Sequence, residues 1–173
     1  MTSVVRPCEV PRDTSLRRYK DAAGYADCYV IEIPGVITQQ AFITAFYSSP
    51  LFKVERTILR FLASKPATDA DVERLAVGRA ATFSAWRVEA QSSSELLLAD
   101  FTGRTRSWLM ALPAVDAASK PSTLLYFGSA VVSQPRGGSG APTMGNLFSA
   151  LLGFHRLYSR LLLAAAGRRV RPL

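Results

Sequence analysis

The sequence is poor in the residues that hold metals and form disulfides. Its 173 residues include one histidine, His155, and two cysteines, Cys8 and Cys28. A single histidine excludes every site that needs two, and the sequence offers no cluster of Cys, His and carboxylate residues at metal-ligand spacing. The cysteines form no CxxC pair, so they allow one disulfide but no disulfide framework. We therefore expect no metal and no cofactor.

Two familiar nucleophile and phosphate motifs are also missing. No GxSxG segment exists to present a serine to His155. The glycine-rich segment GGSGAPTMGN lacks the GK[ST] ending of a phosphate-binding loop and precedes no nucleotide-fold strand–helix unit. These absences favour a flexible connector over residues 134–143 rather than a phosphate site.

Acidic residues are absent after Asp116. Residues 117–173 carry seven Lys or Arg and therefore account for +7 of the formal net charge of +8. Such a segment favours anionic ligands, membrane surfaces or nucleic acid, although blocks of like charge are usually just solvated. No zinc-finger, helix-turn-helix or RNP-like motif accompanies it, which disfavours nucleic acid, but binding of an anionic surface through this segment, whether membrane or nucleic acid, is kept as an alternative function. Contact with a membrane surface through the last helix stays open, as does a homodimer.

We also expect no segment that crosses a membrane or directs secretion. Residues 1–20 have no hydrophobic core of a signal peptide. Residues 147–166 are apolar but contain Arg156 and Arg160, and each central arginine costs about 2.5–3.5 kcal/mol on insertion. Apolar residues make up 49% and charged residues 20%, as in a globular protein of one domain. We expect a cytoplasmic protein.

The first part of the chain predicts a strand and short helices. Residues 27–33 alternate in hydrophobicity, as a strand does. One helix is expected over residues 38–47, and a second begins at Ser49-Pro50, an N-cap followed by proline. Thr68 begins a capping box that predicts a short third helix.

Beyond residue 80 the hydrophobic period changes to two, which predicts an antiparallel meander. The expected strands span residues 83–91, 95–101, 104–112 and 122–133. A two-residue turn at Thr102-Gly103 would pair Ala99 with Arg106 and Leu97 with Trp108. Both faces mix apolar and polar residues, which suits a sheet with one wet side and one cavity side.

The last long segment, residues 144–169, predicts one amphipathic helix. Its apolar face recurs at three- and four-residue steps and comprises Phe148, Leu151, Leu152, His155, Tyr158 and Leu162. A helix with so wide an apolar face needs a partner, and the preceding sheet is the natural one. We therefore predict an α+β fold in which a curved antiparallel sheet wraps around a long C-terminal helix. The chain is expected to consist of a loose arm over residues 1–24, a single domain over 25–167 and a basic tail over 168–173.

This order of elements resembles the START-like helix-grip superfamily (SRPBCC), which includes polyketide cyclases and lipid-transfer domains. The matching stretches are FYSSPLFKVERTIL (46–59), LLLADFTGRTRSWLMAL (96–112) and GFHRLYSRLLL (153–163). Within that superfamily the chain resembles a bacterial family with no assigned function. The resemblance covers residues 26–165, implies a ligand pocket between the sheet and the last helix, and carries over no catalytic residues.

Seven residues are candidates to bind a ligand in that pocket: Tyr47, Trp86, Asp100, Arg106, Trp108, Tyr126 and His155. For the aromatic members, core packing is the alternative role. Histidine exchanges a proton most readily near neutral pH, so His155 is the catalytic candidate, and a hydrogen-bonded core position is its alternative. The sequence thus predicts binding of a small apolar or amphipathic molecule. A cyclase- or dehydratase-like enzyme that uses the same cavity stays open.

Overall fold

The described residues fold around an antiparallel sheet of seven strands. The computed structural model describes residues 4–22, 25–52, 68–132 and 145–170, with side chains of the last range from residue 155 onward. Neighbouring strands follow the order β1-β2-β7-β6-β5-β4-β3. Their bounds are Arg6–Pro7 (β1), Tyr25–Pro34 (β2), Thr82–Phe83 (β3), Trp86–Gln91 (β4), Glu95–Asp100 (β5), Thr105–Val115 (β6) and Pro121–Val131 (β7). The sheet is therefore a meander from β3 to β7, extended by β2 and β1.

Two of the helices begin at threonine caps. The helices whose two ends lie within the described residues are Arg17–Asp21 (α1), Gln39–Tyr47 (α2), Asp69–Ala76 (α4) and Gly145–Arg169 (α5). The Thr38 hydroxyl accepts the Ala41 amide proton at the start of α2, and Thr68 forms a capping box with Asp71 at the start of α4. The helices expected over 38–47, from Thr68 and over 144–169 are confirmed.

A further helix begins at Pro50, as expected. The Ser49 hydroxyl accepts the Phe52 amide proton at 3.2 Å, as an N-cap does. Its continuation beyond residue 52 lies outside the described residues. So do the connector expected over 134–143 and the side chains of Phe148, Leu151 and Leu152.

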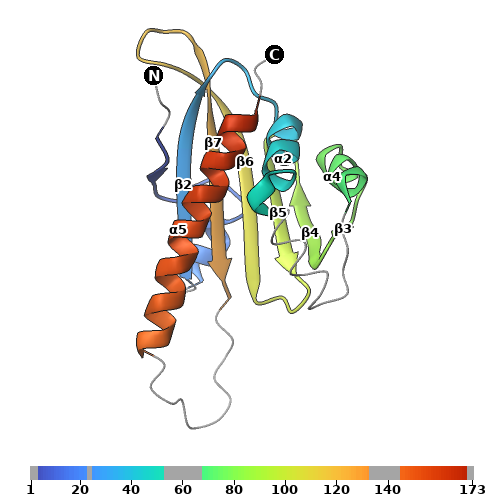
Figure 1. The fold of residues 1–173 in the computed structure, drawn as a ribbon, viewed down its shortest axis with the longest axis vertical. Helices are drawn as coiled ribbons and strands as arrows, with labels where there is room; N and C mark the ends of the chain where they lie inside the picture. The colour runs from blue at the N-terminus through green and yellow to red at the C-terminus, as the bar shows by residue number, and fades with distance from the viewer. Residues whose placement is uncertain (1–3, 23–24, 53–67, 133–144, 171–173) are drawn as a thin grey trace.

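Helices α5 and α2 cover one face of the curved sheet (Figure 1). Helix α5 runs along β2 and β7, and α2 lies beside its C-terminal part, over β6. The side chains between these layers form the main core and include Ile31, Phe42, Phe46, Leu98, Leu109, Leu125, Leu163 and Ala166. This arrangement is the expected α+β architecture of an antiparallel sheet with a long C-terminal helix and short helices.

The opposite face of the sheet carries a second core, which is built by the N-terminal segment. Val10 and Leu16 are buried there against Trp108 of β6 and Cys28 of β2. The Oε2 atom of Glu95 accepts the amide proton of Ser15 at 3.1 Å. Residues 4–22 therefore pack on the sheet, which corrects the expectation of a loose arm over 1–24. Buried apolar side chains and hydrogen bonds to carboxylates of the sheet thus anchor a segment that is polar overall.

Several strand limits differ from those that the sequence predicted. Residues 83–91 divide into β3 and β4, because the chain turns at Ser84, whose φ is 52°. Between β5 and β6 the turn spans residues 101–104, so Phe101 and Arg104 lie outside the strands. The register is nevertheless as expected, with Ala99 opposite Arg106 and Leu97 opposite Trp108.

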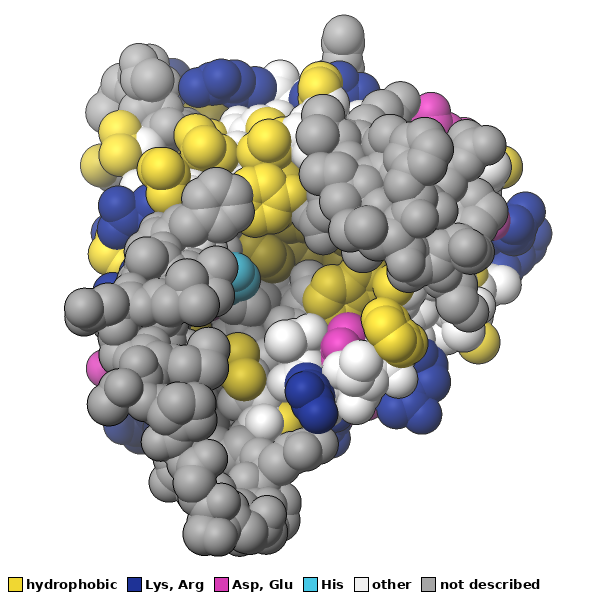
Figure 2. Space-filling model, turned by 60° about the horizontal axis from the view of Figure 1, so that its bottom comes forward, with side chains coloured by type: hydrophobic (Ala, Val, Ile, Leu, Met, Phe, Trp, Pro, Cys, Tyr) yellow, Lys and Arg dark blue, Asp and Glu magenta, His cyan; other side chains and the backbone are white. Residues whose placement is uncertain are grey.

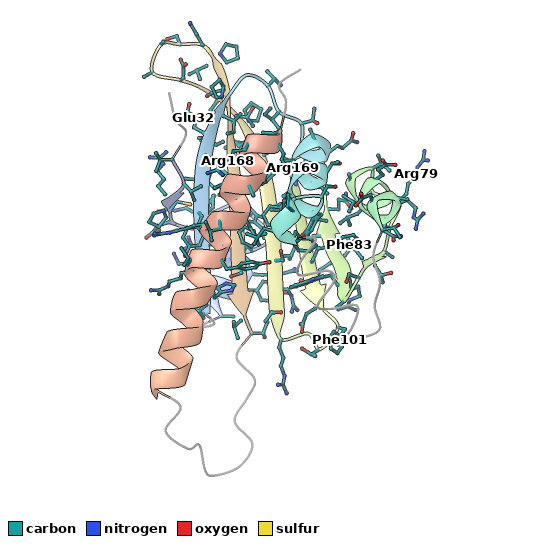
Figure 3. The ribbon with its side chains drawn as sticks, in the orientation of Figure 1. Glu32, Arg79, Phe83, Phe101, Arg168 and Arg169 are labelled. Carbon is teal, nitrogen blue, oxygen red and sulfur yellow. The ribbon has the colours of Figure 1, made fainter. Side chains whose placement is uncertain are left out.

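Helix α5 ends at Arg169, as the sequence predicted, and so extends into the segment that was expected to be a basic tail. Arg168 and Arg169 are the last residues of the helix and are exposed, with Arg169 beside α2 (Figure 3), and Val170 is buried. The basic tail predicted over 168–173 is thus partly helical. Among the described residues, no helix combines the length and apolar character needed to span a membrane.

Candidate functional site

A cavity of about 400 Å³ lies between the sheet and α5. Figure 2 shows a hollow on this side of the molecule, with hydrophobic side chains around it and the histidine side chain at its margin. The cavity exists because the inner face of the sheet turns polar toward one end, where bulky core residues give way to serine and threonine. The register of the strands determines which residues form each wall of the cavity.

The apolar wall is largely aromatic. Phe46 and Tyr47 come from the last turn of α2, and Phe127 comes from the middle of β7. The rings of Phe46 and Phe127 lie with centroids 4.9 Å apart, and those of Tyr47 and Phe52 lie 4.8 Å apart in an edge-on arrangement. Such tilted contacts are favourable for aromatic rings and fix their orientation. Trp86 of β4 extends the same wall.

The opposite end of the cavity is polar because of the pairing of β2 with β7. Asp27 lies directly opposite Ser129 in the register, and the Ser129 hydroxyl donates to Asp27 Oδ1 at 2.6 Å. Ser107 of β6 lies opposite Ser129 on the other side. Tyr25, one row further toward the end of the sheet, donates from its hydroxyl to Asp27 Oδ2 at 3.2 Å. We call Tyr25, Asp27, Ser129 and His155 the polar cluster.

His155 completes the polar cluster from α5. Its Nε2 atom lies 2.7 Å from Ser129 Oγ and 3.7 Å from Asp27 Oδ2. Because the Ser129 hydroxyl gives its proton to Asp27, its oxygen accepts from His155, which assigns the proton to Nε2 in the neutral ring. The Nδ1 atom is then the proton acceptor of the ring. The side chain is 40% exposed, so a small molecule in the cavity can reach it.

The two tyrosines beside Asp27 keep their protons at neutral pH. Burial, together with the negative charge of Asp27, raises the pKa of Tyr29 to about 12. Burial also raises the pKa of Tyr25, against the opposing effect of a hydrogen bond from Arg156. Both phenols therefore remain donors to the carboxylate, with Tyr29 at 3.5 Å. The donors hold Asp27 in place, because each of its oxygens already has a partner.

The arrangement differs from a hydrolytic Ser-His-Asp triad. In a triad the carboxylate orients the ring nitrogen that faces away from the serine. Here Asp27 contacts the serine itself and lies on the Nε2 side of the histidine ring. The polar cluster can hold a polar group and exchange a proton with it, but it does not prepare Ser129 as a nucleophile.

The structure brings together only part of the predicted site. Tyr47, Trp86 and His155 line the cavity. Arg106 borders it as well, but its side chain points to the opposite face of the sheet. There its Nε atom lies 2.7 Å from Glu89 Oε2, and its guanidinium lies 4.6 Å from the centre of the Tyr19 ring.

The remaining three predicted site residues lie elsewhere. Trp108 and Tyr126 are on the opposite face, where Trp108 donates from Nε1 to Glu95 Oε2 at 2.7 Å. Asp100 stabilises the turn after β5, because its Oδ1 atom accepts the Thr105 amide proton at 2.9 Å. Asp100 also borders a separate surface groove. These side chains therefore serve packing and turn formation.

Sequence reasoning missed the central members of the polar cluster, Asp27, Ser129 and Tyr25. A local signal did exist, since Tyr25, Asp27 and Tyr29 alternate along one face of β2. The pairing of Asp27 with Ser129, 102 positions apart, left no sequence signal.

Comparisons with known proteins do not identify a family, since no protein-family model and no curated protein matches this chain. Within the described residues, no group of three or more His, Cys, Asp or Glu side chains converges as metal ligands would. The site is therefore interpreted from its own geometry.

Proposed function

We propose that this protein binds a small amphipathic molecule between its sheet and α5, as a member of the helix-grip proteins that its sequence resembles. The observation that carries the proposal is the gradient of polarity along one cavity. Aromatic side chains such as Phe46 and Phe127 line one part, and three members of the polar cluster, Tyr25, Ser129 and His155, line the other. A volume of about 400 Å³ is in the range of cavities that hold small molecules.

The gradient supports a particular orientation of the ligand. Its apolar body would lie against Phe46, Tyr47 and Phe127, and its polar group would face His155. Asp27 already accepts protons from Ser129 and Tyr25, and within the described part of the chain His155 Nδ1 is an acceptor of the polar cluster that has no hydrogen-bond partner. A ligand hydroxyl, phenolic or aliphatic, fits this acceptor best.

The two tryptophans of the chain provide a test, because they lie on opposite faces of the sheet. Trp108→Phe leaves Trp86, beside the cavity, as the only tryptophan. Trp86→Phe leaves Trp108 as the only tryptophan, on the opposite face. We expect alkylphenols and fatty alcohols to change the emission of the first variant at saturating concentration and not that of the second. Equal responses would indicate adsorption to the surface, and a silent Trp86 across the panel would contradict the proposal.

The short contact between Ser129 and His155 favours a second function, a proton-transfer enzyme of the cyclase or dehydratase kind that uses the same cavity. If His155 moves protons, His155→Ala should lower turnover of an identified substrate by about 10²–10⁴-fold, the usual contribution of an acid–base group. Binding of the same substrate should survive. Unchanged turnover would assign His155 to ligand orientation alone.

A further inference from the structure

The two cysteines of the chain lie together on the face of the sheet opposite the cavity. Cys8 follows β1, and Cys28 belongs to β2. The Cys8 amide donates to the Cys28 carbonyl at 2.9 Å, and the two Sγ atoms are 3.3 Å apart. Both are free thiols. This closeness is independent of the ligand proposed above.

The backbone around the two thiols already has the geometry of neighbouring antiparallel strands. Pro7 lies opposite Tyr29 in the register, so Cys8 and Cys28 form the next position along the same ladder. A disulfide bond is about 2.0 Å long and tolerates little movement of the strands that it joins. Side-chain rotation that shortens the present distance between the sulfurs is the main change required.

The two thiols differ in reactivity. Cys28 is 3% exposed, whereas Cys8 is half-buried and borders a surface groove that also includes Arg156 and Arg160. The hydrogen bond that the two thiols share lowers the pKa of Cys8, with a further contribution from the charge of Arg6, while burial opposes it. The same hydrogen bond and burial raise the pKa of Cys28. Cys8 is therefore the thiol that reacts first, and Cys28 is the one that resolves.

We propose that Cys8 and Cys28 form a reversible disulfide by exchange with a low-molecular-weight disulfide such as glutathione disulfide, and that this bond fastens the N-terminal segment to β2. The Cys8 thiolate attacks one sulfur of glutathione disulfide and displaces a glutathione thiolate, which leaves a mixed disulfide on Cys8. Cys28 then loses its proton to solvent, attacks the Cys8 sulfur and displaces the second glutathione. The protein loses two hydrogens, and glutathione disulfide becomes two glutathione molecules.

The consequence concerns the anchoring of residues 4–22. In the dithiol form these residues are held by side chains such as Leu16 and by hydrogen bonds to Glu95 and Glu89. A bond between Cys8 and Cys28 would close a short loop and restrict the unfolded chain, which stabilises the folded state. We expect oxidation to raise the Tm by about 5–10 °C for a chain of this length.

The experiment is an equilibrium titration of the full chain with mixtures of glutathione and glutathione disulfide. The titration is carried out first in native buffer, where the chain is folded, and then in guanidinium chloride, where it is unfolded. Samples are quenched in acid and alkylated with N-ethylmaleimide, and the mass of the intact protein is measured. We expect the folded chain to lose two hydrogens and to take up no maleimide at ratios roughly 30- to 1,000-fold less oxidising than the unfolded chain requires. Equal ratios in the two conditions, or a mixed disulfide that accumulates on the folded wild type, would overturn the proposal.

Single variants serve as matched controls for the order of the two steps. Cys28→Ser should hold glutathione on Cys8 as a stable adduct, because no resolving thiol remains. Cys8→Ser should leave Cys28 unmodified, because that thiol is buried. Near-UV circular dichroism checks that both variants are folded. The reverse pattern of adducts would contradict the assignment of Cys8 as the attacking thiol.

Discussion

At the scale of single residues, Gly128 shows how closely the N-terminal segment approaches the sheet. It lies in β7 between Cys28 and Trp108. A Cβ atom built there would lie 2.5 Å from Leu16 Cδ2 and 3.0 Å from the carbonyl oxygen of Asp27. Real carbon atoms do not approach so closely, so the absence of a side chain is what permits Leu16 to be fully buried. The sequence indicated none of this, because a glycine inside a strand has several possible causes.

Gly128→Ala should therefore lower the free energy of unfolding by about 1–3 kcal/mol, the usual cost of overpacking. Urea denaturation monitored by circular dichroism measures the change. A matched control is the same substitution in a Leu16→Ala background, where the clash with Leu16 is removed. The cost of Gly128→Ala should be smaller there, since the two sites share one contact. Equal costs in both backgrounds would show that Leu16 is not the neighbour that matters.

At the scale of elements, the segments that the sequence predicted well are those whose signals are local. The Thr38 and Thr68 caps, the turn near Gly103 and the periodicity of α5 each depend on residues a few positions apart. The N-terminal segment has no such signal. Its buried residues, Val10 and Leu16, are separated by polar neighbours, and the carboxylates that bind it lie 70–80 positions away. Composition alone therefore suggested a loose arm.

Glu89 gives the anchoring of this segment a pH dependence. Burial alone would raise its pKa, but the Tyr19 hydroxyl and the guanidinium groups of Arg106 and Arg18 outweigh burial and hold the pKa below its ordinary value. A carboxyl whose folded pKa is lowered contributes stability above its unfolded pKa and loses it as pH falls through the folded value. The contribution of Glu89 should thus be complete at neutral pH and decline below about pH 4.3, the ordinary value for Glu.

Glu89→Gln should lower stability at neutral pH by about 2 kcal/mol, because Arg106 is left buried without its partner. The difference from wild type should shrink as pH falls below about 4.3, since wild-type Glu89 is then protonated as well. Denaturation curves at several pH values measure both effects. Glu73→Gln, at an exposed position of α4, is the control. A difference that stays constant down to acidic pH would contradict the role given to the Glu89 carboxylate.

The basic residues of the last helix did not indicate a site in the sequence, because their contacts depend on which strand the helix covers. Arg156 donates from Nε to the Tyr25 hydroxyl at 3.3 Å, and the Arg160 guanidinium lies 5.5 Å from the centre of the Tyr29 ring. Two of the seven basic residues in the C-terminal third thus contact β2 next to the polar cluster. Charge counting cannot reveal such contacts, because it does not say which strand the helix covers.

At the scale of the whole molecule, the fold was more predictable than the site. Periodicities of two and of 3.6 residues predicted the sheet and the helices, and the described part of the predicted α5 face, His155, Tyr158 and Leu162, does lie toward the sheet. The polar cluster required the pairing of β2 with β7, two strands separated by most of the chain. His155 was identified from the sequence because it is the sole histidine. Trp108 and Arg106 were assigned to the wrong face, because they alternate along β6 with the residues that face the cavity. One position of register decides on which side of a sheet such residues lie.

The central claim is that one cavity holds an amphipathic molecule, and native mass spectrometry of the purified protein, followed by mass spectrometry of its organic extract, tests it most directly. Ser107 faces the cavity and Leu157 of α5 is 57% exposed, so Ser107→Trp and Leu157→Ala are the matched variants. The account predicts a retained small molecule with both apolar and hydroxyl groups in wild type and Leu157→Ala, and its loss from folded Ser107→Trp. A protein that stays empty after incubation with amphipathic mixtures, or a Ser107→Trp variant that retains as much compound as wild type, would contradict it.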